Sequence, residues 1–121
     1  MTFGFDIDGT ITAHPVEMGA IMKALVDAGH QVIVITGALS RMPIPVEERQ
    51  RQLAELCSHI LQLTHYHDII VCEAETLEGV ARLKGKVCGE RKVNMIFEDE
   101  EDFVRWIRAL SVQTACVLVR P

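Results

Sequence analysis

The most constraining feature of this chain is a regular alternation of strand-like and helix-like segments along its whole length. Short apolar, β-branched runs predict strands, and apolar residues at helical spacing predict the helices between them. Residues 31–35 form the clearest strand, because a continuous run of this kind is typical of a strand buried on both faces of a sheet. The predicted strands are 2–7, 31–35, 68–72, 93–97 and 114–119, and the predicted helices are 16–28, 46–63, a stretch within 76–91 interrupted at Gly85, and 100–110.

Five strands in alternation with four helices predict an α/β fold, a three-layer Rossmann-like arrangement in which a parallel sheet carries helices on both faces. We expect the strand order 5-4-1-2-3, which makes strands four, one and two neighbours. The 121 residues are a length typical of one domain, and they contain no internal repeat, low-complexity tract or linker. The sequence therefore predicts a single domain over residues 1–121.

Two helices give specific expectations about which residues face the core. In helix 16–28, Ile21, Leu25 and Ala28 share one face, and Gly29 just beyond it is a typical helix stop. Helix 46–63 begins with Glu-Glu-Arg-Gln-Arg, which we expect to face solvent, and continues with apolar residues at helical spacing. Those apolar residues are Leu53, Leu56, Cys57, Ile60 and Leu61.

Composition and charge narrow the class of protein. The formal net charge of −5 argues against a general nucleic-acid-binding surface or an anionic-membrane binder, but it allows a nucleotide held by a few local cations. The N-terminus lacks the basic region of a signal peptide, and no apolar segment approaches the roughly 20 residues that span a bilayer. The four cysteines are scattered singly, which favours reduced, buried thiols over disulfides or zinc ligands. We therefore expect a cytoplasmic protein without a membrane segment.

The most specific motif, Phe-Gly-Phe-Asp-Ile-Asp-Gly-Thr, follows the first strand. It places two carboxylates at the mouth of the sheet, where a divalent cation and a phosphate can be held together. Two further strands end in polar residues, and ligands of open parallel sheets bind beyond the carboxyl ends of the strands. We therefore expect three strand ends to converge on one crevice. Their polar residues are Asp6 and Asp8, Thr36 and Gly37, and Glu98 and Asp99.

This pattern resembles the haloacid dehalogenase (HAD) superfamily, and the resemblance covers essentially the whole chain. It implies that Asp6 attacks phosphorus and forms an aspartyl-phosphate, while Asp8 protonates the leaving oxygen and then deprotonates the hydrolytic water. It also implies that Mg²⁺ is bound by the Asp6 carboxylate and the Asp8 backbone carbonyl and bridges to phosphate oxygens. Thr36 matches the second motif of the family, whose hydroxyl and nearby backbone N–H groups, here at Gly37, bind the phosphate.

A lysine and an acidic pair match the family's third and fourth motifs. Lys84 is the best-placed cation to offset the negative charge at the site, and Lys86 is the alternative. Asp99 is implied as a direct Mg²⁺ ligand. Glu98 departs from the usual Asp or Gly at its position, and its extra methylene would crowd the metal or reach it through water. Arg41, in the loop after the second motif, could hold a substrate carboxylate or a second phosphate by a bidentate contact.

The resemblance therefore implies a Mg²⁺-dependent phosphatase that hydrolyses a phosphate monoester. The segments between the motifs are too short for the cap domain that many family members carry. Capless relatives act on large substrates or borrow a lid from a neighbouring subunit. We therefore expect either a nucleotide or macromolecular phosphorylated substrate or a homo-oligomer, with the loop at 38–46 making the contact.

Two other classes of protein stay open. One is a catalytically weak or silent HAD-like binding protein, suggested by Glu98 and by the short loop after Thr10. The other is a receiver-type signalling domain, which has the same length and a similar acidic cluster. A receiver carries its phosphoacceptor aspartate at the end of strand three, where this chain has Cys72 and Glu73. The receiver reading is therefore the less favoured of the two.

Overall fold

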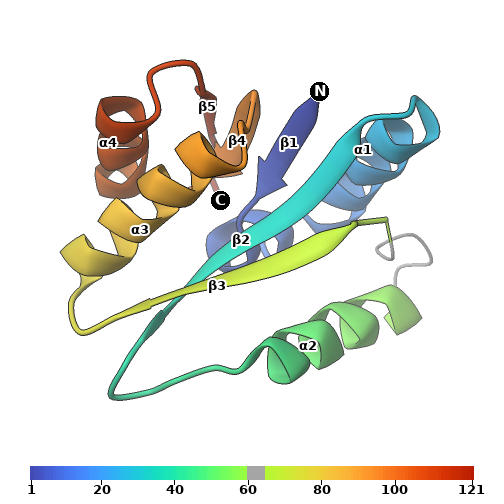
Figure 1. The fold of residues 1–121 in the computed structure, drawn as a ribbon. Helices are drawn as coiled ribbons and strands as arrows, with labels where there is room; N and C mark the ends of the chain where they lie inside the picture. Colours follow the sequence, from blue (N-terminus) through green and yellow to red (C-terminus); the bar gives the residue numbers. More distant parts are fainter. Residues whose placement is uncertain (60–64) are drawn as a thin grey trace.

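A five-stranded parallel sheet with strand order β3-β2-β1-β4-β5 lies at the centre of the structure (Figure 1). The structure is a computed structural model that describes residues 1–59 and 65–121. The observed order is the predicted one seen from the other edge, so the predicted fold class and topology are confirmed. The strands are β1 (Thr2–Phe5), β2 (Gln31–Leu39), β3 (Asp68–Ala74), β4 (Met95–Glu98) and β5 (Ala115–Leu118). The helices are α1 (Pro15–Asp27), α2 (Val46–His59), α3 (Leu77–Glu90) and α4 (Glu101–Leu110), with an irregular helical turn, η1, at Ile7–Ile11.

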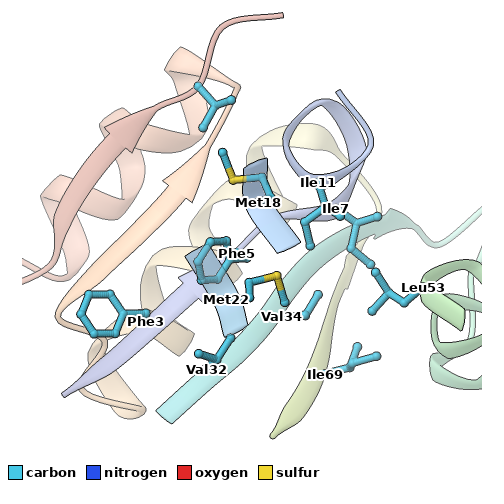
Figure 2. Close-up of a cluster of buried hydrophobic side chains, with 11 residues drawn as sticks. Phe3, Phe5, Ile7, Ile11, Met18, Met22, Val32, Val34, Leu53 and Ile69 are labelled. Atoms are coloured by element: carbon cyan, nitrogen blue, oxygen red, sulfur yellow. The ribbon is translucent and has the colours of Figure 1, made fainter. Parts of the chain in front are cut away.

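The two faces of the sheet carry separate apolar clusters, which explains the continuous apolar run of β2. Val32 and Val34 pack under α1 and α2, whereas Ile33 and Ile35 pack under α3 and α4. Successive strand residues point to opposite faces, so a strand covered on both sides needs apolar residues at every position. Figure 2 shows the first cluster, in which Met18 and Met22 of α1 and Leu53 of α2 approach the sheet. Full burial of one such side chain contributes about 1.5–3 kcal/mol.

Helix α1 ends as predicted but faces the core with different residues. The Gly29 N–H donates to the Val26 carbonyl, the His30 N–H donates to the Leu25 carbonyl, and Gly29 has a φ of 87°. These two hydrogen bonds, together with a residue in the left-handed conformation, form the Schellman motif that ends many helices. Glycine adopts this conformation without strain. The predicted inward face was partly wrong: Met18 and Met22 are the buried residues, Ile21 and Leu25 pack at the edge of the cluster, and Ala28 is exposed.

Two further elements differ from their predicted bounds. Strand β2 runs to Leu39, so Thr36 and Gly37 lie within the strand rather than after it. Helix α3 runs without interruption through Gly85, where a Cβ would lie 3.0 Å from the Trp106 carbonyl oxygen. Gly85 is therefore a point of close helix–helix approach, and the predicted break there was wrong. The predicted end of helix 46–63 lies largely outside the described residues, as do the side chains of Cys57, Ile60 and Leu61.

The connections and the thiols agree with the remaining expectations where the structure describes them. In the described ranges, only α1 lies between η1 and β2, and α2 is the one element between β2 and β3, so no cap domain is present there. Cys72 and Cys88 are buried and Cys116 is half-buried, and all three are free. Burial raises the pKa of the Cys72 thiol to about 11 and that of Cys88 to about 12. Among the described helices, none is long and apolar enough to cross a membrane.

Candidate active site

The predicted convergence of polar strand ends takes place at a pocket of about 670 Å³. The N–H of Asp6 donates to the Phe97 carbonyl at 3.0 Å, which extends the pairing of β1 with β4 and brings Asp6 beside Glu98. Asp6, Asp8, Gly37, Lys84 and Asp99 all line the pocket. Thr36 and Glu98 are fully buried just beneath it and are not among its lining residues.

Lys84 joins two of the strand ends through a buried ion-pair triad. Its Nζ lies 2.8 Å from Asp6 Oδ1 and 2.7 Å from Glu98 Oε2, and its side chain is 1% exposed. Burial alone would lower the pKa of Lys84, but the two carboxylates outweigh burial and hold this pKa above its ordinary value. Lys84 lies in the middle of α3 rather than at the predicted helix start. Lys86 is 68% exposed and pairs with Glu90, so the geometry favours Lys84 as the site lysine.

Glu98 has a partner for each carboxylate oxygen. Oε2 accepts from Lys84, and Oε1 accepts the backbone N–H groups of Asp99 at 3.1 Å and Glu100 at 3.3 Å. Burial raises the pKa of Glu98 to about 8, with Asp6 adding to the rise and Lys84 opposing it. Burial is the larger cause, and the single lysine shared by two carboxylates does not offset it. A contact of Glu98 with a metal would have to share an oxygen that already accepts a hydrogen bond.

Asp6, Glu98 and Asp99 form a cluster that fits a divalent cation. Their carboxylate oxygens lie within 4.8 Å of one another. Asp99 Oδ1 is buried and has no hydrogen-bond partner in the part of the chain that the structure describes. Burial raises the pKa of Asp6, Lys84 opposes the rise and Asp99 adds to it. Like charges this close, with a buried oxygen unpartnered, form the hard-oxygen donor set that Mg²⁺ prefers.

Gly9 allows the Asp99 carboxylate to lie directly on the backbone of the first motif. The residue has a φ of 76°, and a Cβ there would lie 2.1 Å from Asp99 Oδ2. Both the backbone conformation and the space therefore exclude a larger residue. The Asp-Gly-Thr turn thus positions Asp99 as well as Asp8.

Arg49 is the site residue that the sequence analysis placed wrongly. It lies on α2, in the charged stretch predicted to face solvent, yet its side chain is only 4% exposed. Nη2 lies 2.9 Å from Asp8 Oδ2, and Nη1 lies 3.3 Å from Asp8 Oδ1. Nη2 also donates to the Gly37 carbonyl at 3.0 Å, and Nη1 donates to Gln52 Oε1 at 2.9 Å. The available signal was spacing, because Arg49 stands four residues before the buried Leu53, on the same helix face.

The other predicted phosphate contacts have different environments. Arg41 is exposed on the loop after β2 and does not line the pocket, whereas Arg49 and the exposed Arg105 do. Thr36 Oγ1 is buried without a hydrogen-bond partner among the described residues, and Thr10 Oγ1 is in the same condition. Leaving a buried hydroxyl without a hydrogen bond costs about 1–3 kcal/mol of stability. A ligand that hydrogen-bonds to either hydroxyl would recover part of that cost. Gly37 lines the pocket itself.

One side of the pocket is apolar and aromatic. The N-terminal parts of α3 and α4, which lie side by side (Figure 1), supply Leu77, Val80, Phe103 and Trp106 to its lining. Leu77 is 63% exposed. The Lys84 ammonium lies 4.8 Å from the centre of the Phe103 ring, so this wall begins next to the carboxylate cluster.

Comparisons with known proteins support the fold. No protein-family model matches the chain, and no curated protein matches it. A chain from a structure of the Pnkp1/Rnl/Hen1 complex has a TM-score of 0.70 and 17% identity over 98% of this chain, which spans 45% of that chain. A protein from the universal stress protein family of Burkholderia pseudomallei has a TM-score of 0.63 and 15% identity, covering 99% of this chain and 96% of its own. At these identities the likeness shows a shared three-layer α/β fold.

Proposed function

We propose that this chain is a Mg²⁺-dependent phosphatase of the HAD type that hydrolyses a phosphate monoester through an aspartyl-phosphate on Asp6. The observation that carries the proposal is the environment of Asp6, which is buried at the floor of a pocket between Lys84 and Asp99. Lys84 occupies Oδ1 of Asp6 and so leaves Oδ2 available for attack. A carboxylate that is fixed through one oxygen and lines a pocket is suited to nucleophilic catalysis.

The chain's own residues supply each step of the reaction. Asp6 Oδ2 forms a bond to phosphorus as the bond from phosphorus to the leaving oxygen breaks, and Asp8, which must carry a proton at this step, gives that proton to the leaving oxygen. Asp8 then takes a proton from water, whose oxygen attacks phosphorus. This second attack releases inorganic phosphate and restores the Asp6 carboxylate. Lys84 stays bound to Asp6 and Glu98 throughout and offsets the negative charge that gathers around them.

The charge of the site explains why a metal would be needed. Asp6, Asp8, Glu98 and Asp99, when ionised, carry four negative charges against the two positive charges of Lys84 and Arg49. A bound Mg²⁺ would neutralise the remaining two negative charges and polarise the phosphate oxygens. Asp6 and Asp99 would hold it through their carboxylates, and the resemblance adds the Asp8 carbonyl.

The pocket favours a substrate with a bulky leaving group. Its volume is far greater than a phosphate needs, and the wall with Leu77, Phe103 and Trp106 offers apolar area to whatever carries that phosphate. A nucleotide or the phosphorylated end of a macromolecule fits this shape. Without a cap, closure of the pocket falls to such a substrate or to a second copy of the chain, and Met42, 71% exposed in the loop after β2, is suited to that contact.

The test is release of inorganic phosphate from phosphorylated metabolites, nucleotides, phosphorylated oligonucleotides and a generic aryl phosphate. We expect turnover that requires Mg²⁺ and is lost in Asp6→Asn, a variant that keeps the shape of the side chain. Circular dichroism would verify that this variant is folded. Near-native turnover by a folded Asp6→Asn protein would refute the role of Asp6.

The same assay separates the alternative classes. A silent binding protein would bind phosphorylated ligands but show no Mg²⁺-dependent turnover of the aryl phosphate. A receiver domain finds little support, because β3 ends at Glu73 and Ala74, and Glu73 is exposed and does not line the pocket.

A further inference from the structure

The bidentate pair between Arg49 and Asp8 joins one fixed side chain to one free side chain. The Arg49 side chain is 4% exposed and is also held by the Gly37 carbonyl and the Gln52 side chain. The Asp8 side chain is 63% exposed. When this pair opens, Asp8 is therefore the partner that moves away. The guanidinium stays bound to the Gly37 carbonyl and the Gln52 side chain, and we call the position that Asp8 leaves the anion slot.

The pair has to open if Asp8 serves the reaction. Both carboxylate oxygens of Asp8 face the guanidinium. A group that exchanges a proton with the leaving oxygen needs one of its oxygens within hydrogen-bond distance of that atom. The orientation in this structure points them at Arg49 instead.

When Asp8 is not bound to Arg49, another anion has to occupy the anion slot to balance the charge of the guanidinium. A buried cation without a counter-charge is strongly unfavourable, and Arg49 Nε already lacks a hydrogen-bond partner among the described residues. The guanidinium also lies close to the predicted phosphate position. The Gly37 carbonyl accepts a hydrogen bond from Arg49. A Cβ added at Gly37 would lie 3.8 Å from Lys84 Cε, so Gly37 is close to both cations.

We propose that Arg49 is a substrate-binding residue whose guanidinium is exchanged between Asp8 and a phosphoryl oxygen of the substrate. Asp8 occupies the anion slot in the free protein. When the phosphoryl group enters, it takes the two N–H groups, and Asp8 takes up a proton from solvent as it turns toward the leaving oxygen. This inference rests on the proposed function for the identity of the anion.

The experiment measures binding of inorganic phosphate by calorimetry in the presence of Mg²⁺, alongside KM and kcat. Arg49→Gln should weaken phosphate binding and raise KM on the order of tenfold to a hundredfold, the range for losing charged hydrogen bonds. Arg51→Gln is the matched control, because Arg51 lies two residues further along α2, is 68% exposed and pairs with Glu48. It should bind phosphate as the native chain does. If Arg49→Gln does not fold, Arg49→Lys takes its place, with weaker binding still expected because lysine cannot make the bidentate contact.

Asp8→Asn tests the exchange itself, because it removes the competing anion. Phosphate should bind more tightly to Asp8→Asn than to the native chain, and this gain should disappear when Arg49→Gln is added. A gain that persists in the double variant, or unchanged binding in Arg49→Gln, would overturn the inference while leaving the proposed hydrolysis intact. Loss of phosphate binding in Arg49→Gln without any turnover by the native chain would instead support the anion site and refute the phosphatase.

Discussion

Replacing Lys84 with methionine would test whether the buried triad depends on its single ammonium group. Methionine keeps much of the apolar stem, so packing around α3 should change little. Asp6 and Glu98 would remain, 7% and 0% exposed in their side chains, without the cation that lies between them. Removing one partner from a buried ion pair costs about 3–5 kcal/mol, out of a total stability of roughly 5–15 kcal/mol for a domain.

The assay is urea unfolding of the metal-free protein at pH 5 and pH 8. With an m-value of about 1.5 kcal/mol/M, the expected loss moves the midpoint at pH 8 by roughly 2–3 M. The pKa of Lys84 is raised in the folded state, so its stabilisation is present below its ordinary pKa of 10.5 and is lost only above that range. Both test conditions therefore lie where the native lysine acts fully. The variant should lose less at pH 5, because its two carboxylates can then take up protons.

Lys86→Met is the control, since Lys86 lies on the same helix, is 68% exposed and should matter by no more than about 0.5 kcal/mol. A loss below about 1 kcal/mol in Lys84→Met at pH 8, or an equal loss at both pH values, would show that the reasoning about the triad is wrong. Glu98→Gln added to Lys84→Met should recover part of the stability, because it removes one of the stranded charges.

Three further predictions concern the carboxylates and the turn. Asp99→Asn should weaken Mg²⁺ binding, measured by calorimetry, far more than Glu100→Gln, because Asp99 belongs to the three-carboxylate cluster and Glu100 does not; equal effects would indicate a diffuse acidic surface. Gly9→Ala should lower both the melting temperature and the Mg²⁺ affinity, since a Cβ would strike the Asp99 carboxylate; an unchanged affinity would argue against this placement. The raised pKa of Glu98 means that its contribution to stability is present below about 4.5 and is lost as pH rises through about 8. Metal-free protein should therefore become less stable across that range, and Glu98→Gln should flatten the trend in urea unfolding; identical slopes would contradict it.

The sequence was sufficient for the fold and for the general location of the site because both depend on local patterns. Apolar runs and helical spacing identified the alternating elements, and their order placed Asp6 and Asp99 at adjacent strand ends. Two errors came from contacts between distant segments. Arg49 is buried because Asp8, 41 residues away, supplies its counter-charge. Gly85 continues a helix because α4 packs against it closely.

Charged residues give little indication from sequence of whether they face solvent. Arginine is rarely buried unless it is paired, so the start of α2 was read as exposed. The sequence favours Arg41 because it follows Thr36 closely along the chain. Arg49, eight residues later on α2, is the one of these two arginines that lines the pocket. For the same reason the choice between Lys84 and Lys86 needed three-dimensional positions, since the two residues differ by about half a helical turn.

The contact of Lys84 with both Asp6 and Glu98 also limits how this chain can diverge over time. Losing Lys84 alone leaves two carboxylates in the interior without a cation, whereas losing Glu98 leaves a balanced pair of Lys84 and Asp6. Replacement of Lys84 before Glu98 must therefore pass through a less stable intermediate. Descendants of this sequence should lose the glutamate at position 98 before or together with the lysine at position 84, and a chain with a neutral residue at 84 but glutamate at 98 should be selected against.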